Sequence, residues 1–205
     1  ESHTPPLLKS IERFINLSKK IGPEAVHWRY DPIILSSLTS EAFHIENFSY
    51  IANKLKGSTG ICTISFVQFY EKSRDNLKKI TEWQGHNQMG CRPDAQQKLC
   101  QKKKILQISN SEQHRIRFDE PSQERKIKLT KTLKEIAAKN GIKLRSCCDN
   151  SLLSAGIPKG SCIGPEYLSL LKTDSYDNWK KKPTRKECAC FESVDIGTYE
   201  TCTFG

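Results

Sequence analysis

The sequence has no long hydrophobic run. Its longest apolar stretch, ICTISFVQFY at residues 61–70, has the length of a strand, far short of the ~20 residues that a helix needs to cross a bilayer. The start also lacks the basic segment and following apolar segment of a secretion signal. These absences exclude a membrane-spanning helix and predict no membrane partner. The nine cysteines are odd in number and unevenly spaced, which argues against a secreted disulfide scaffold, so a reducing cytoplasm is the expected location.

The sequence is also poor in apolar residues, which make up 36% of its 205 residues, against 27% charged ones. Part of the chain is therefore expected outside the core. The net charge of +10 comes largely from lysine-rich stretches at 102–104, 126–134 and 179–187. These lysines either form a solvated surface or meet the phosphate backbone of a nucleic acid. No aromatic residues alternate with them, as they would on a platform that stacks single-stranded bases.

Helical and strand patterns alternate along the chain, with apolar residues at helical spacing in some stretches and continuous apolar runs in others. Helices are predicted over 7–21, 39–56, 71–83 and 121–140, and strands over 25–35, 61–70 and 142–148. Thr39 is the expected cap of the second helix, with a buried stripe at Ala42, Ile45, Phe48, Ala52 and Leu55. The order α-β-α-β-α-α-β predicts an α/β fold with right-handed crossovers and a parallel sheet.

A complete eight-stranded barrel takes ~250 residues, so three strands predict a partial (β/α) barrel-like sheet followed by a cysteine-rich C-terminal segment. The expected divisions are β/α units at 1–83, an inserted mobile loop at 84–118, a helix, strand and short helix of the same domain at 119–172, and the cysteine-rich segment at 173–205. The inserted loop has no sustained periodicity and is rich in Gln, Lys and Asn. Cys91, Cys100, His86 and His114 within it are candidate metal ligands, but their spacing matches no standard zinc pattern, and the favoured alternative is a loop without a site.

Polar residues follow the first predicted strand in the stretch RYDP. Arg29 and Asp31 are two residues apart, so they share one face of that strand. Working residues of parallel α/β folds gather at the carboxyl ends of strands. Arg29 and Asp31 are therefore candidate catalytic residues. In this role Arg29 would hold a carboxylate or phosphate, and Asp31 would orient it or accept a proton. The alternative is a structural ion pair beneath the mouth of the sheet.

Six of the nine cysteines follow residue 145, at 147, 148, 162, 188, 190 and 202. Zinc and iron–sulfur clusters take about four thiolates. The predicted set of metal ligands is Cys148 (or Cys147), Cys162, Cys188 and Cys190. The sequence lacks the two C-x-x-C knuckles of a zinc ribbon. The alternative is that these cysteines are reduced and pack as small hydrophobic residues.

Four stretches of the sequence are distinctive: IGPEAVHWRYDPIIL, CTISFVQFY, GIPKGSC and CACFESVDIGTYETC. Together they resemble the uncharacterised, mainly prokaryotic domain-of-unknown-function 1848 family. The resemblance implies a radical-SAM-like protein with a barrel-type fold and a distant likeness to spore photoproduct lyase. Two features depart from the family pattern, namely Gln68, where an aspartate is usual, and the insertion after Trp83.

The resemblance further implies that the last run continues into a C-x-x-x-C-x-x-C motif that holds a [4Fe–4S] cluster and S-adenosylmethionine. Cys202 would be the first cysteine of that motif, and the other two would lie beyond this chain. The chain is therefore expected to be an inactive fragment of a cluster-dependent enzyme of unknown small-molecule or nucleic-acid substrate. The competing hypotheses are a structural four-cysteine zinc or iron–sulfur protein without catalysis and a basic nucleic-acid-binding module.

Overall fold

The computed structural model describes residues 5–69, 75, 77, 116–164, 180–181, 187–194 and 196–197. Its elements are, in chain order, α1 (Leu7–Ile21), β1 (Trp28–Ile33), β2 (Leu35–Ser36), α2 (Glu41–Leu55), β3 (Ile61–Phe66), β4 (Phe118–Asp119), α5 (Gln123–Lys139), β5 (Lys143–Ser146) and the 3₁₀ helix η1 (Asn150–Ala155). No helix in this part of the chain is long and apolar enough to cross a membrane.

Three of the strands form one parallel sheet in the order β1-β3-β5. Arg29 of β1 lies opposite Thr63 of β3, and Thr63 lies opposite Arg145 of β5. The predicted parallel α/β fold is confirmed, whereas the described strands show an open sheet and no barrel. β2 and β4 add a small antiparallel pair that the sequence patterns did not predict.

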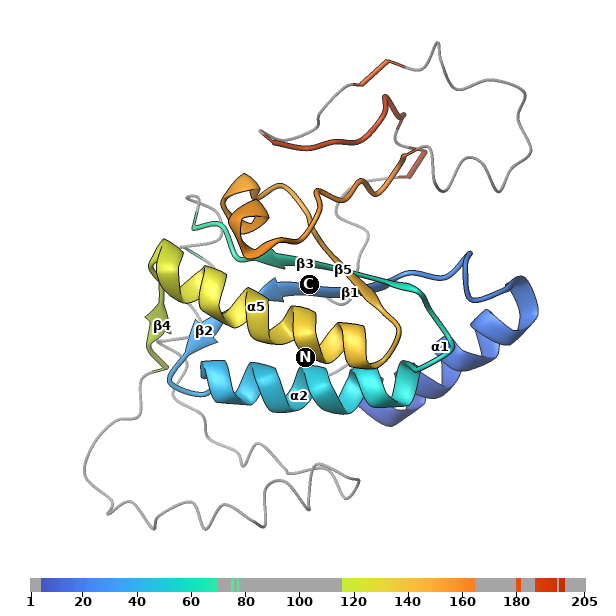
Figure 1. Cartoon of the computed structure of the whole chain (residues 1–205), viewed down its shortest axis with the longest axis horizontal. Helices are drawn as coiled ribbons and strands as arrows, with labels where there is room; N and C mark the ends of the chain where they lie inside the picture. Colours follow the sequence, from blue (N-terminus) through green and yellow to red (C-terminus); the bar gives the residue numbers. More distant parts are fainter. Residues whose placement is uncertain are drawn as a thin grey trace.

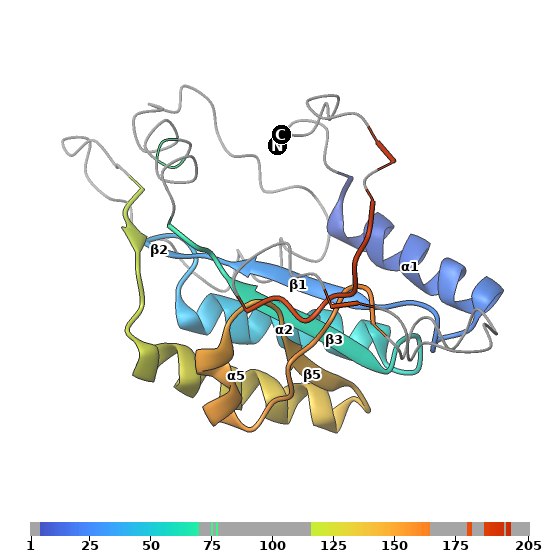
Figure 2. The same cartoon turned by 90° about the horizontal axis from the view of Figure 1, so that it is seen from above.

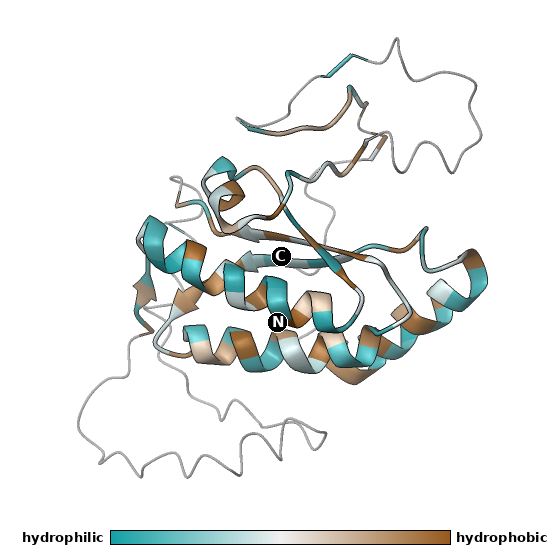
Figure 3. Cartoon of the chain, viewed as in Figure 1, coloured by the Kyte–Doolittle hydropathy of each residue, from teal (hydrophilic) through white to brown (hydrophobic). Residues whose placement is uncertain are grey.

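Helices α2 and α5 run side by side along one face of this sheet (Figure 1). Segment 187–194 lies on the other side of the sheet from them in the same view. Hydrophilic (teal) and hydrophobic (brown) residues alternate along both helices in Figure 3. This is the pattern of amphipathic helices, which pack one side against a sheet. The view of Figure 2 shows α1 beyond the edge of the sheet formed by β1.

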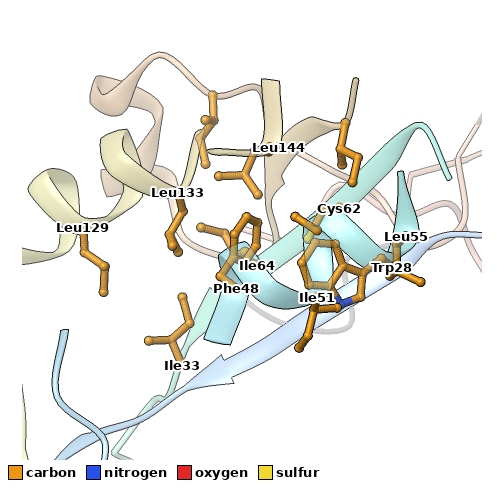
Figure 4. Packing of buried hydrophobic residues seen from close by; sticks show 14 of the residues in the cluster. Trp28, Ile33, Phe48, Ile51, Leu55, Cys62, Ile64, Leu129, Leu133 and Leu144 are labelled. Carbon is orange, nitrogen blue, oxygen red and sulfur yellow. The ribbon is translucent and has the colours of Figure 1, made fainter. Parts of the chain in front are cut away.

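An aromatic group on β1 and α2 forms the centre of the core (Figure 4). Phe48 is fully buried, and its ring stacks on Trp28 with ring centroids 4.6 Å apart. The ring of Tyr30 meets Phe48 edge to face at 5.1 Å. Because side chains alternate along a strand, Trp28 and Tyr30 face α2 while Arg29 and Asp31 face the opposite side of the sheet.

The start of α2 differs from the prediction by one residue. Ser40, and not Thr39, is the cap, because its side chain accepts a hydrogen bond from the Phe43 amide. The Thr39 hydroxyl instead donates to the Ile34 carbonyl at 2.6 Å and holds the preceding turn. Of the predicted stripe, Ala42 is exposed and Ile45 is only partly buried. The buried stripe consists of His44, Phe48, Ile51, Ala52 and Leu55.

His44 is buried because its ring completes a hydrogen-bond network between α2 and β1. Its Nε2 lies 2.9 Å from the Ile34 carbonyl, which only accepts, so Nε2 carries the proton. Nδ1 then accepts from the Tyr30 hydroxyl at 2.9 Å, and Asn47 Nδ2 donates to that hydroxyl at 3.2 Å. Burial raises the pKa of Tyr30 to about 12, so this hydroxyl keeps its proton. The network satisfies three polar side chains beside the core.

This network predicts a loss of stability on acidification. Burial lowers the pKa of His44, whereas a histidine in the unfolded chain titrates at about 6.5. As pH falls below that value the unfolded chain binds a proton that the folded chain excludes, so the free energy of unfolding falls. Urea unfolding at pH 7.5 and pH 5 measures the change. The His44→Gln variant is expected to lose less stability over this interval, and an equal loss in both proteins would contradict the assignment.

Several predicted segments lie wholly or largely outside the described residues. Of the helix predicted at 71–83, only Asp75 and Leu77 are described, and both are helical. The predicted inserted loop is described only in its last residues, 116–118. Cys202 and most of the segment 173–205 are likewise outside the described part.

Candidate functional site

The candidate site lies on the face of the sheet opposite α2 and α5, near the carboxyl ends of the strands. The Arg29 guanidinium forms a bidentate salt bridge with the Asp31 carboxylate, in which Nε donates to Oδ1 at 3.2 Å and Nη2 donates to Oδ2 at 2.5 Å. The Ser65 hydroxyl of β3 also reaches Asp31 Oδ2, at 3.4 Å. The hydrogen bonds to Asp31 are the largest effect on Arg29 and raise its pKa above the ordinary value. Arg29 is therefore a fixed positive charge.

The end of β5 places two cysteines beside this pair. The Cys147 amide donates to the Ile64 carbonyl of β3 at 2.9 Å, which extends the sheet by one residue. Both Cys147 and Cys148 are buried, with 4% of each residue exposed. Cys148 has a φ of +53°, which non-glycine residues rarely adopt. This conformation leaves the two adjacent sulfurs 3.7 Å apart.

A second chain segment brings Cys162 to the same place. The Ser146 amide donates to the Pro158 carbonyl at 3.0 Å, and the Gly160 amide donates to the Ser146 carbonyl at 2.7 Å. A Cβ on Gly160 would lie only 3.1 Å from the Cβ of Arg145, so the close approach of this segment to β5 favours glycine. The residues that follow, including the exposed Cys162, therefore lie beside the end of β5.

Arg29 is in contact with these thiols as well as with Asp31. Its Nη1 lies 2.7 Å from the Cys162 sulfur, and it also bonds the Cys147 sulfur. A hydrogen bond from Cys162 and the contact with Arg29 lower the pKa of Cys147 to about 5, although burial opposes this shift. The same hydrogen bond and burial raise the pKa of Cys162. Cys147 is thus a thiolate near neutral pH, and Cys162 carries the shared proton.

A third segment, 187–194, adds the remaining cysteines. The Cys162 amide donates to the Cys190 sulfur at 3.1 Å, and the Cys190 amide donates to the Cys188 sulfur at 3.5 Å. The Phe191 amide donates to the Ile163 carbonyl at 2.9 Å. These bonds join the segment to the chain around Cys162. Cys147, Cys148, Cys162, Cys188 and Cys190 are called the cysteine cluster below.

The segment is also held through Glu187, whose carboxylate accepts a hydrogen bond from the Asn150 amide at 2.8 Å. Glu187 has a φ of +67°. Among the described residues, it and Cys148 are the only non-glycine residues with positive φ. Both therefore adopt an unfavourable backbone conformation at the cysteine cluster, and such conformations gather at functional sites.

The donor atoms of the cysteine cluster are of the type that binds a metal. Its five thiols are the soft ligands that zinc and iron–sulfur clusters take, and amide donors to sulfur, such as those to Cys188 and Cys190, are usual around such thiolates. Within the described residues, however, no group of three or more His, Cys, Asp or Glu side chains already converges on one position for an ion.

The comparisons with known proteins identify the family. A family model described as a domain of unknown function, DUF1848, matches residues 1–205. The chain belongs to the DUF1848 family. No curated protein and no solved structure matches the chain.

The structure places the predicted residues of this DUF1848 chain in two groups. Arg29, Asp31 and the five members of the cysteine cluster lie together, whereas Cys202, Cys91, Cys100, His86 and His114 are outside the described residues.

Three contacts of the site were not predicted from the sequence. These are Arg29 with the Cys162 sulfur, Glu187 with the Asn150 amide, and Gln68 Nε2 with the Cys148 carbonyl at 3.3 Å. The last contact gives Gln68 the role of a donor that fixes the Cys148 turn, and an aspartate side chain there would have no proton to donate when ionised. Strand alternation places Arg29 and Cys147 on one face, but only the folded chain brings Cys162 to them.

Proposed function

We propose that this DUF1848 chain is a metal-thiolate protein whose site is the cysteine cluster. The ligands are Cys162, Cys188 and Cys190 together with one of Cys147 and Cys148. The single observation that supports this most is the joining of three chain segments through their cysteines, with the amides of Cys162 and Cys190 donating to the sulfurs of Cys190 and Cys188. Packing of reduced cysteines alone does not require bonds to sulfur.

The surroundings of the cysteine cluster hold in place the chain segments that carry the cysteines. Gln68 and the positive φ of Cys148 hold one side, and Glu187 holds the other. Arg29 adds a positive charge, which offsets the negative charge that several thiolates bring together. A bound zinc ion would supply a structural cross-link between the sheet and segment 187–194, and an iron–sulfur cluster would supply electron transfer.

Elemental analysis of the protein purified without oxygen tests this proposal. About one zinc, or several irons with equivalent sulfide, per chain is expected from four thiolates. The double variant Cys188→Ser, Cys190→Ser is expected to lose at least about tenfold in metal content or affinity. The free energy of unfolding is also expected to fall, because bound metal stabilises the folded state.

The matched control is Cys91→Ser with Cys100→Ser, which removes two cysteines outside the proposed ligand set. This variant is expected to keep its metal. Protein without zinc or iron, or a Cys188/Cys190 variant with wild-type metal content, would count against the proposal.

The finer proposal is that the whole protein is a radical-SAM-type enzyme. Its support is the run of residues ending in Cys202 that resembles the start of a C-x-x-x-C-x-x-C motif, together with the Arg29–Asp31 pair near the carboxyl ends of the parallel strands. A [4Fe–4S] cluster with S-adenosylmethionine would supply radical chemistry. In this proposal Arg29 and Asp31 bind and orient the substrate.

The test uses a version of the protein that carries the complete three-cysteine motif, reconstituted without oxygen. An EPR signal of a reduced cluster and release of 5′-deoxyadenosine from S-adenosylmethionine are expected, and both should disappear in Cys202→Ala. If neither appears in the unchanged motif, the enzyme proposal is wrong, while the metal content of the cysteine cluster is decided separately by the Cys188/Cys190 variant.

A further inference from the structure

Cys147 and Cys162 are paired through their own side chains. Their sulfurs hydrogen-bond to one another, although 14 residues lie between them in the sequence. The pairing follows from the backbone, because the Gly160 amide bonds the Ser146 carbonyl and so aligns the residues after 160 with the end of β5. Two thiols in side-chain contact require only a small movement to reach disulfide geometry, in which the sulfurs are ~2.05 Å apart.

Arg29 gives this pair the electropositive surroundings that are typical of reactive cysteines. Its guanidinium lies 2.7 Å from the Cys162 sulfur and also bonds Cys147. Asp31 fixes the guanidinium through two further bonds, so the positive charge does not move away from the sulfurs.

The two cysteines differ in access. Cys162 is exposed, whereas Cys147 is buried at 4% exposure. A reagent in solution therefore reaches the sulfur of Cys162 first, and Cys147 lies behind it. This arrangement of one accessible and one sheltered sulfur is what a thiol–disulfide exchange through a mixed disulfide requires.

We propose that Cys147 and Cys162 are a redox-active dithiol, which a small-molecule disulfide oxidises to an intramolecular disulfide. The proton that the two sulfurs share first passes from Cys162 to Cys147. The Cys162 thiolate then attacks the small disulfide, whose S–S bond breaks to give a mixed disulfide and one released thiolate, which takes the proton from Cys147. The Cys147 sulfur then attacks Cys162, which forms the Cys147–Cys162 bond and releases the second thiol. The protein loses two electrons and the one proton that the pair shares. The small disulfide gains the two electrons and leaves as two thiols, the second of which takes its proton from water.

This activity goes beyond metal binding and does not depend on it. The two share Cys162, so bound metal and the disulfide exclude one another. Oxidation is accordingly expected in metal-free protein and is expected to be slower when metal is bound.

The experiment treats the purified chain with oxidised glutathione, with and without prior removal of metal by a chelator, and maps the product by mass spectrometry after trypsin cleavage. Cleavage after Arg145, Lys159 and Lys172 puts Cys147 and Cys162 on separate peptides, 146–159 and 160–172. A linked pair of these peptides, lighter than their sum by two hydrogens and separated by dithiothreitol, is the expected product.

Cys148 lies on the same peptide as Cys147, so variants assign the bond. The link is expected to persist in Cys148→Ser and to disappear in Cys147→Ser. Cys62→Ala is the matched control for loss of a buried thiol, since Cys62 is fully buried, and the link is expected to persist there. Arg29→Gln is expected to slow link formation at least about tenfold, because the sulfurs lose their positive neighbour.

The proposal is overturned if metal-free protein gives no link between these peptides, or if the link survives in Cys147→Ser. Metal content, measured on the same samples, is a separate readout. A chain that binds no metal but forms the link contradicts the metal proposal alone, and a chain that binds metal but forms no link after its removal contradicts the dithiol alone.

Discussion

Phe48→Ala is expected to lower the free energy of unfolding by about 3–5 kcal/mol, which is a large part of the stability of a domain. Phe48 is fully buried between β1 and the rest of α2, and it stacks on Trp28 at 4.6 Å. Removing its ring leaves a cavity and takes one aromatic contact from each of Trp28 and Tyr30. Urea unfolding followed by circular dichroism measures the loss.

Two further variants make this result specific to the core. Phe48→Leu keeps most of the volume and is expected to cost less than the alanine variant, so it reports on the site even if Phe48→Ala does not fold. Leu38→Ala removes an apolar side chain that is 57% exposed and is expected to change stability by at most about 0.5 kcal/mol. Equal losses in Leu38→Ala and Phe48→Ala would contradict the packing described.

Arg29→Gln is expected to move the ionisation of Cys147 to higher pH. The hydrogen bond from Cys162 and the contacts with Arg29 hold the pKa of Cys147 at about 5. At pH 7 a thiol with that pKa is about 99% ionised, whereas a thiol with the ordinary pKa of about 8.5 is about 3% ionised. Removing the positive charge therefore raises the pKa and lowers the ionised fraction at neutral pH.

The measurement is a pH titration of thiolate ultraviolet absorbance in chelator-treated protein, with Cys147→Ser to assign the transition. Arg125→Gln is the matched control, because this guanidinium also binds two carboxylates, those of Glu41 and Asp119. It is expected to leave the titration unchanged. A midpoint that is the same in wild type and Arg29→Gln would show that Arg29 does not set the charge state of the thiols.

The longer helices and the three parallel strands of the described residues follow from local patterns, and so the sequence predicted them, whereas it did not predict the short pair β2 and β4. Apolar residues at helical spacing in α1 and α5 and the nearly continuous apolar run of β3 require burial on one side or on both, and β1 alternates between a buried and a polar face. The alternation of these elements implied parallel pairing through crossovers, which β1, β3 and β5 show. Family membership also followed from stretches of sequence, since the DUF1848 model matches the chain.

Details that depend on competing partners were predicted less well. Thr39 and Ser40 are both good caps, and the choice depended on the Ile34 carbonyl, which takes the Thr39 hydroxyl. His44 is polar and was not expected in the buried stripe of α2. It is buried because Tyr30 and the Ile34 carbonyl satisfy both of its ring nitrogens, and neither partner is near it in sequence.

The sequence by itself determined the order of elements, the parallel sheet and the residue types of the candidate site. Alternation along β1 was enough to place Arg29 and Asp31 on one face. Only the tertiary structure decided that Arg29 reaches Cys162, because that contact joins residues 133 positions apart. It depends on the backbone bonds that align Gly160 with the end of β5, and bonds between distant segments leave no periodic pattern in the sequence.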